Sequence, residues 1–153
     1  MSGKQRGFEQ VIKSARKYET KGFIPQRATE KSAGYDLKTP IDLVIPANGY
    51  QTFFTNLKAY MQDDEVLKIY IRSSLGFKHG LMLANNVGII DADYYSNSDN
   101  DGNIGIRLYN SSDQQLEFEA GTRICQGIFE NYLTVDQDGA SQSRQGGMGS
   151  TGE

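Results

Sequence analysis

The segment Leu67-Lys68-Ile69-Tyr70-Ile71 alternates three apolar residues with two residues that carry polar groups. Successive side chains of a β-strand point to opposite faces of a sheet, so this alternation is typical of a strand with one buried face. The same period of two recurs from Ile104 to Tyr109 and from Leu116 to Glu119. The sequence therefore predicts an all-β protein.

Turn sequences separate these strands. Asn48-Gly49 and Asp101-Gly102 favour the positive φ angles of tight hairpin turns, and Ala120-Gly121 is expected to end one strand before the next begins. Short strands at this spacing are typical of a sandwich or barrel. One stretch fits a helical period instead, and we expect a short helix or an irregular entry there, formed by Phe8, Val11, Ile12 and Ala15.

The composition limits the classes of protein. The chain has 153 residues, the usual size of one domain. A formal net charge of -3 argues against a protein that coats nucleic acid, because coating requires clustered lysine and arginine. No apolar run could span a membrane and no signal-peptide core is visible, so we expect a soluble, cytoplasmic protein that binds neither nucleic acid nor membranes. Cys125, the single cysteine, is predicted to be a small buried residue.

The character of the chain changes at about Gln137. Residues 137–153 are rich in glycine and serine and contain almost nothing apolar to bury. Such a segment cannot offset the entropy that it loses on ordering. We therefore expect residues 1–136 to form one β domain and residues 137–153 to form a flexible C-terminal arm.

Several segments combine glycine or serine with a charged side chain, which is the composition of a phosphate site. In chain order they are Pro25 to Leu37, Arg72 to Gly80, Asn85 to Tyr94, Gly121 to Gln126 and Arg144 to Gly152. In this order they resemble the five motifs of the trimeric dUTPase family, of bacterial or phage type. The resemblance implies a homotrimer of distorted jelly-roll β-barrels of the β-clip type, and hydrolysis of dUTP to dUMP and pyrophosphate with Mg²⁺ as cofactor.

Hydrolysis at the α-phosphate places negative charge on the leaving pyrophosphate, so cations and hydrogen-bond donors must converge there. Arg72 and Arg144 can each present a planar fork to phosphate oxygens. The resemblance implies that Arg72, Ser73 and Gln126 hold the phosphate chain and that the arm closes over the γ-phosphate. Further hydroxyl or backbone donors would come from Ser74, Ser150 and Thr151.

Two acidic positions carry the predicted chemistry. By the resemblance, Asp36 holds Mg²⁺ through its waters, although an aspartate after Gly34-Tyr35 could equally cap a turn. No serine, histidine and acid arrangement is visible, so the nucleophile is expected to be a water, and Asp91 matches the family's catalytic base. Asp93 would share a strand face with Asp91, so the pair either shares a site or lines a turn; we expect Asp93 to support the site, with an arginine as a candidate partner.

Selection of base and sugar follows from the third motif. The resemblance implies that backbone groups from Asn85 through Gly88 to Ile90 read the uracil edge in a pocket too tight for the methyl group of thymine. Tyr94 matches the tyrosine that packs under the deoxyribose, the alternative being an ordinary strand aromatic. The lone His79 is expected to be structural.

The chain departs from the family pattern at two places. Met148 stands where the family usually has an aromatic residue that stacks on uracil. The polar segment from Tyr95 to Asn103 is longer than the turn of many members, and is expected to be a solvent-exposed loop or a surface for another protein.

Two alternatives to a dUTPase alone remain open. One is a dCTP deaminase of the same superfamily, which Arg72-Ser73-Ser74-Leu75 would also suit. The other is a phage-type protein with an added regulatory role through a partner protein. The resemblance further implies that each active site combines phosphate-binding residues from one subunit, the uracil pocket from a second and the arm from a third.

Overall fold

The computed structural model describes residues 3–152 of the chain. Strands dominate it, and the helical elements are one short α-helix and two 3-10 turns. The elements are β1 (Gly7–Gln10), η1 (Lys13–Ala15), β2 (Gln26–Arg27), β3 (Tyr35–Lys38), β4 (Leu43–Ile45), β5 (Tyr50–Phe54), β6 (Leu57–Tyr60), β7 (Glu65–Ile71), α1 (Ser73–His79), β8 (Leu81–Leu83), β9 (Gly88–Asp91), η2 (Ala92–Tyr94), β10 (Gly105–Asn110), β11 (Leu116–Phe118) and β12 (Arg123–Asn131). The prediction of an all-β protein is confirmed.

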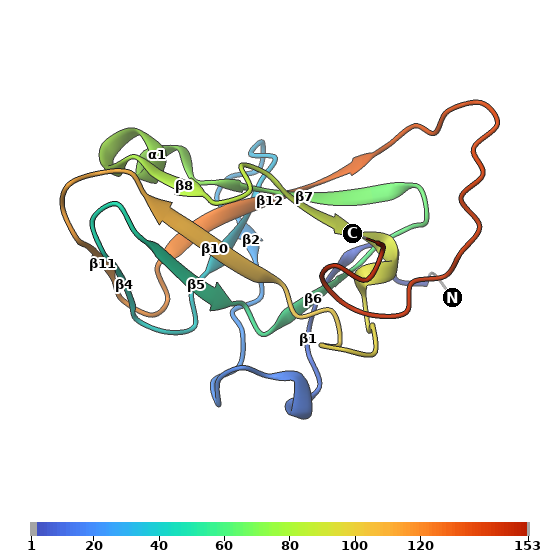
Figure 1. Cartoon of the computed structure of the whole chain (residues 1–153), viewed down its shortest axis with the longest axis horizontal. Helices are drawn as coiled ribbons and strands as arrows, with labels where there is room; N and C mark the ends of the chain where they lie inside the picture. The colour runs from blue at the N-terminus through green and yellow to red at the C-terminus, as the bar shows by residue number, and fades with distance from the viewer. Residues whose placement is uncertain (1–2, 153) are drawn as a thin grey trace.

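The strands form a five-stranded sheet in the order β2-β3-β12-β7-β9, a three-stranded sheet in the order β5-β10-β8, and the pairs β1-β6 and β11-β4. Every pairing is antiparallel. Figure 1 shows the β5-β10 pair passing in front of β12, whose other part lies beside β7. Among residues 3–152 the hydrogen-bonded ladders remain separate and do not close into a continuous barrel.

The core lies between these sheets, and it contains the apolar residues that the alternation predicted. Leu67 and Ile69 of β7 are 0% and 1% exposed, whereas Lys68 and Tyr70 between them are half-buried. In and beside β10, Ile104, Ile106 and Leu108 are buried. Complete removal of such side chains from water stabilises the fold by about 1.5–3 kcal/mol each. The core contains Cys125 as predicted, and burial raises the pKa of its thiol, which leaves it protonated and inert.

Of the two alternatives predicted near the N-terminus, the short helix is wrong and the irregular entry is closer to the structure. Phe8 lies in β1, which pairs with β6, and the only helical turn among residues 3–25 is η1. Val11 is buried while Ile12 is 57% exposed, so the apolar residues do not share one face. Strand pairing decides the conformation, because the neighbouring strand satisfies the backbone groups that a short isolated helix would leave unpaired.

Asn48, Asp101 and Gly102 adopt the predicted positive φ angles, whereas Gly49 does not, and neither turn is a hairpin. Asn48 has φ 52°, and Asp101 and Gly102 have φ 58° and 85°. The strands on either side of each turn belong to different sheets, so these turns connect layers of the fold. The short helix α1 was not predicted, and it ends at Gly80, whose φ of 62° suits glycine.

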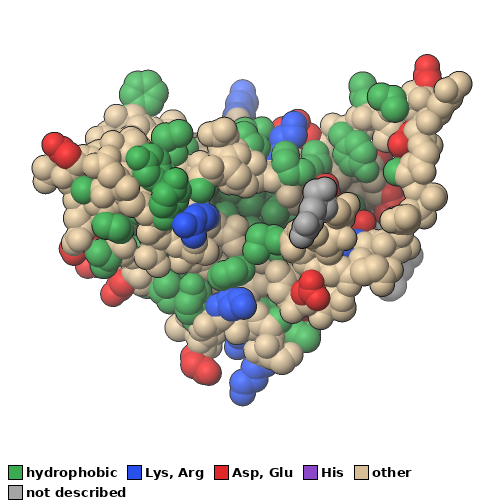
Figure 2. Space-filling model, in the orientation of Figure 1, with side chains coloured by type: hydrophobic (Ala, Val, Ile, Leu, Met, Phe, Trp, Pro, Cys, Tyr) green, Lys and Arg blue, Asp and Glu red, His purple; other side chains and the backbone are tan. Residues whose placement is uncertain are grey.

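The C-terminal arm leaves β12, extends away from the body and returns to η2 (Figure 1). Residues 131–143 are exposed, whereas Gly146 and Gly147 are buried against the protein. In the space-filling view the arm forms a rim at the right of the molecule (Figure 2). No helix in the described part of the chain is long and apolar enough to cross a membrane.

Candidate active site

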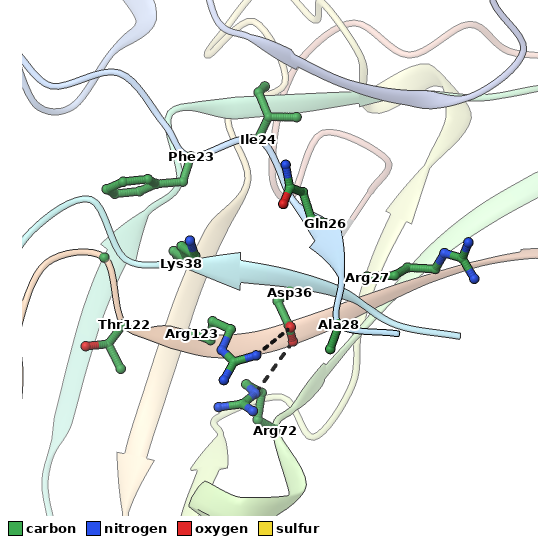
Figure 3. A pocket seen from close by; sticks show the side chains of 11 residues that line it. Phe23, Ile24, Gln26, Arg27, Ala28, Asp36, Lys38, Arg72, Thr122 and Arg123 are labelled. Carbon is green, nitrogen blue, oxygen red and sulfur yellow. Dashed lines mark hydrogen bonds and ion pairs between the residues drawn. The ribbon is translucent and has the colours of Figure 1, made fainter. Parts of the chain in front are cut away.

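A pocket of about 860 Å³ opens beside the edge of the five-stranded sheet and is rich in cations. Asp36 of β3 lies between two arginines: Arg72 Nε is 3.5 Å from Asp36 Oδ1, and Arg123 Nη1 is 3.4 Å from Oδ2 (Figure 3). Arg27 and Lys38 also line the pocket. A pocket lined by four cations, two of which contact one carboxylate, suits a polyanion such as a triphosphate.

Strand pairing brings the residues of this pocket together. Asp36 is opposite Gln126 in the β3-β12 register. Arg72 follows β7, the other neighbour of β12, and its backbone N–H donates to the carbonyl of Ile124 at 3.1 Å. Three segments that are distant in sequence are therefore held side by side by backbone hydrogen bonds, which fix where their side chains start.

Three further predicted phosphate ligands, Ser73, Ser74 and Gln126, lie on segments that flank this pocket. Ser73 and Ser74 begin α1 directly after Arg72. Gly34 packs so closely against the Gln126 side chain that a Cβ at position 34 would overlap its amide. The glycine of this motif is thus required by a close approach, which the sequence alone did not reveal.

Arg123 is the residue that the sequence analysis passed over. It belongs to the fourth motif, two residues before Cys125, but the resemblance assigned it no role. Its guanidinium contacts Asp36 as Arg72 does, and 46% of its side chain remains exposed. The signal in the sequence was a basic residue shortly after Gly121. In the structure that residue begins β12 and contacts Asp36.

Asp36 suits a magnesium site only if phosphate oxygens supply further ligands to the ion. Its carboxylate is 13% exposed and already faces two guanidinium groups. Within residues 3–152 no cluster of three or more histidine, cysteine or acidic side chains could hold a metal by itself. Mg²⁺ needs few protein ligands when phosphate oxygens and waters complete its octahedron, so a single carboxylate is sufficient for it.

A second group of predicted residues lies around the end of β9. Arg144 of the arm contacts two acids: Nη2 is 2.9 Å from Asp91 Oδ2, and Nε is 2.9 Å from Asp93 Oδ1. The arginine predicted as a partner for Asp93 is thus Arg144. Its side chain is only 7% exposed, whereas the two carboxylates are more than half exposed. Asp91, Arg144 and Thr151 line a pocket of about 620 Å³.

A smaller pocket of about 160 Å³ adjoins Tyr94. Its lining includes Met148 of the arm, Tyr94, and three residues of the predicted base-reading segment, Asn85, Gly88 and Ile90. Met148 is 70% exposed and lies at this pocket rather than in the core. The arm therefore covers the pocket that the third motif forms.

Tyr94 is held from two sides. It is 7% exposed, and its hydroxyl donates to the carbonyl of Asn103 at 3.1 Å and accepts from Asn100 Nδ2 at 2.8 Å. Burial raises the pKa of Tyr94, so its phenol stays neutral at any physiological pH. The ring lies beneath the Arg144 guanidinium, 5.6 Å from ring centroid to Cζ.

The two groups are far apart within one chain. Asp91 pairs with Val66, near the start of β7, while Arg72 follows the other end of that strand. At about 3.3 Å per residue, this stretch of β7 separates them by roughly 20 Å. A catalytic base takes a proton from a water within hydrogen-bond reach, and that water must lie beside the phosphate that it attacks. Asp91 and Arg72 of one chain are too far apart for this, so one chain alone does not bring them into one site.

Within this single chain the arm lies against the acidic end of β9. Arg144 and Met148 lie against the Asp91 and Tyr94 region of their own chain. Ser150 Oγ donates to the carbonyl of Gly146 at 2.8 Å and lies 3.2 Å from Arg144 Nη1, so it shapes the arm itself.

His79, predicted to be structural, packs against Phe118 with ring centroids 6.3 Å apart.

Comparison with known proteins agrees with this geometry. The family model described as dUTPase matches residues 20–152. Deoxyuridine 5'-triphosphate nucleotidohydrolase of Lactococcus lactis is 44% identical over 97% of this chain and 99% of its own length. The Arabidopsis thaliana protein of that name is 36% identical over 90% of this chain and 81% of its own. A crystal structure of dUTPase from Streptococcus mutans superposes with a TM-score of 0.75 at 43% identity, covering 85% of this chain and 98% of that one.

An all-β subunit with a cationic pocket and an acidic end of β9 thus belongs to a family of nucleotide hydrolases with the jelly-roll fold. The chain is a member of the dUTPase family. It is an enzyme, and its activity is the hydrolysis of dUTP to dUMP.

Proposed function

We propose that Asp91 orients a water and takes its proton while the water oxygen attacks the α-phosphorus of dUTP. The new bond from oxygen to phosphorus forms as the bond from the α-phosphorus to the bridging oxygen breaks, and pyrophosphate leaves with that electron pair. The observation that carries this assignment is the position of Asp91 at the end of β9, exposed between the Tyr94 pocket and the Arg144 pocket. The reaction limits uracil in DNA and supplies dUMP for dTMP synthesis.

The phosphate chain is proposed to bind in the pocket around Asp36. Arg72 and Arg123 would each present a fork to its oxygens, and Ser73 and Gln126 would add donors from the adjacent strands. Asp36 would hold Mg²⁺ through waters once the phosphates had taken over its two arginines. When bound, that ion supplies charge neutralisation on the pyrophosphate as it leaves.

Base and sugar are proposed to bind where Met148 covers the small pocket. Its volume of about 160 Å³ has room for a single nucleobase. The backbone from Asn85 to Ile90 offers donors and acceptors for the uracil edge, and buried Tyr94 forms a wall under the sugar. A pocket that pairs with uracil leaves cytosine mispaired, and such a mismatch can discriminate by roughly 10⁴–10⁵.

We infer that the working enzyme is a homotrimer. The roughly 20 Å of β7 between Asp91 and Arg72 supports this inference, because a neighbouring subunit can bring its own Asp91 to the phosphate pocket. Residues 131–143 are exposed, and within the described chain the backbone from Leu133 to Ser143 forms no hydrogen bond to the body. This segment would let an equivalent arm from a third subunit make the contacts that the arm makes here.

Pyrophosphate release from dUTP, dCTP, dTTP and UTP, with and without Mg²⁺, tests the proposal. We expect release from dUTP alone and dependence on Mg²⁺. Asp91→Asn should lower turnover by about 10²–10⁴ while a non-hydrolysable dUTP analogue still binds. Asp113→Asn, in an exposed turn, is the control and should retain full activity. Ammonia release from dCTP would identify the deaminase instead, and full activity of Asp91→Asn would exclude Asp91 as the base.

A further inference from the structure

The loop that follows Tyr94 is internally braced. Asn97 provides most of the bracing: its Nδ2 donates to the carbonyl of Tyr94 at 2.8 Å, and its Oδ1 accepts from the backbone N–H groups of Asp99 and Asn100 at 3.0 and 3.2 Å. An asparagine that closes local turns in this way holds a loop in one conformation. Of the two alternatives predicted for Tyr95 to Asn103, a solvent-exposed loop or a surface for another protein, the first describes only part of the segment, because Asp101 to Asn103 are buried.

The loop is also anchored to the body by a buried ion pair. Lys58 Nζ lies 3.0 Å from both carboxylate oxygens of Asp101, and the two side chains are only 8% and 10% exposed. The backbone N–H of Ile12 donates to the same carboxylate at 2.8 Å. A charge pair that is buried and hydrogen-bonded on several sides fixes its neighbours in place, because leaving one charge unpaired is costly.

The arm docks on this braced loop. Asp99 Oδ2 accepts a hydrogen bond from the backbone N–H of Gly147 at 2.7 Å, and Ser98 Oγ donates to the carbonyl of Gln145. Gly146 is buried against the loop, and a Cβ at this position would overlap the Asp99 carboxylate. Gly146 and Gly147 therefore both lie in close contact with the loop, and a side chain at position 146 would fit only if the Asp99 carboxylate moved.

The docked glycines determine where the functional residues of the arm lie. Arg144 precedes them and reaches Asp91, and Met148 follows them and lies at the Tyr94 pocket. The loop is linked to that pocket as well, since Asn100 Nδ2 donates to the hydroxyl of Tyr94. A shift of the glycine pair would displace both side chains together.

We propose that residues 97–100 form a docking cradle for the C-terminal arm, and that Asp99 is the positioning residue that sets its closure over the substrate. The partner of this surface is the arm of the same protein, from its own or a neighbouring subunit. The inference rests on the proposed function only for the role of the arm as the lid of the dUTP site. The docking contact itself can be measured without any substrate.

Trypsin provides that measurement. Arg144 is the only lysine or arginine after Arg123, so cleavage behind it releases residues 145–153 as one peptide. Its side chain is 7% exposed in the docked arm, so docking should protect the bond. The rate of appearance of the peptide, followed by mass spectrometry on the intact enzyme, reports how often the arm leaves the cradle.

Asp99→Ala should speed this cleavage about tenfold, the change expected when a hydrogen bond to a charged group is lost. The same variant should raise KM for dUTP severalfold with a smaller change in kcat, because it weakens closure and leaves Asp91 and the phosphate pocket intact. Asp113→Ala, an exposed acid in another turn, should change neither quantity. Unchanged cleavage and KM in Asp99→Ala would overturn the cradle while leaving dUTP hydrolysis by Asp91 unaffected.

A pair of variants separates direct contact from general loosening of the loop. Gly146→Ala should speed cleavage because the new methyl group collides with the Asp99 carboxylate. In the Asp99→Ala background that carboxylate is absent, so Gly146→Ala should add little. Additive effects of the two changes would show that the residues do not meet, and would overturn the proposed contact.

Discussion

Arg144 Nη2 lies 2.9 Å from Oδ2 of Asp91, so an arginine of the arm that was predicted to bind phosphate pairs with the proposed base. Asp93 shares the same guanidinium at 2.9 Å. A triphosphate carries more negative charge than these two exposed carboxylates, so binding should transfer Arg144 to the phosphates. Asp91 is then free to accept a proton from water.

Arg144→Lys should raise KM for dUTP by about tenfold or more. Lysine keeps the charge but lacks the planar fork that forms two parallel hydrogen bonds to an oxyanion. Steady-state kinetics measure the change, and an unaltered melting temperature would show that the fold is intact. A wild-type KM in this variant would remove Arg144 from the list of substrate ligands.

Mixed trimers test which subunit supplies the arm. Asp91→Asn chains carry an intact arm, and chains truncated after Ser143 carry an intact Asp91. Each homotrimer should be inactive, and mixing after mild dissociation should restore part of the activity, because the exposed segment from 131 to 143 allows the arm to cross between subunits. Mixing that restores no activity would instead assign the arm to the subunit whose Asp91 it contacts here.

Met148→Phe should tighten dUTP binding or raise turnover. Met148 lies at the Tyr94 pocket, and a phenyl ring there would stack on uracil, an interaction worth about 1–3 kcal/mol per base. Met82→Phe, on an exposed face of β8, is the matched control and should have no effect. Equal or poorer kinetics in Met148→Phe would count against stacking by this position.

Asp101→Asn should destabilise the protein by about 3–5 kcal/mol, because it leaves the buried Lys58 ammonium without its counter-ion. Asparagine tolerates the positive φ of this position, so the loss would report the charge rather than backbone strain. Urea unfolding monitored by circular dichroism measures it, with exposed Asp113→Asn as control. A loss as small as that of the control would contradict the importance of the pair.

The Glu65 carboxylate should make stability depend on pH in the acid range. The hydrogen bonds from Arg6 lower the pKa of Glu65 below its usual 4.5, so folding favours the charged form. The contribution is complete above that value and is lost as the pH falls through the lower pKa of the folded state. The melting temperature of Glu65→Gln should lie below that of the wild type at pH 7, and the two should converge in acid. A constant difference across this range would falsify the linkage.

Residue types and their order along the chain were enough to predict the activity, hydrolysis of dUTP to dUMP. The alternation around Leu67 and Ile106 predicted buried strands, since a period of two has one structural meaning. The order of five short motifs indicated the family. The strand order, the separate ladders and the position of β1 could not be predicted from the sequence. They depend on which distant strands pair and not on local periodicity.

The tertiary structure alone decided how the predicted residues are grouped. Pairing of β7 with both β9 and β12 places Asp91 and Arg72 at opposite ends of one strand, which no spacing in the sequence reveals. From the sequence, the loop after Tyr94 is a polar segment without an assigned role. In the structure, Asn97 and the Lys58–Asp101 ion pair hold it in the conformation that contacts the arm. Sequence fixes which groups are present, but long-range backbone pairing and buried charge set the distances between them, and chemistry depends on those distances.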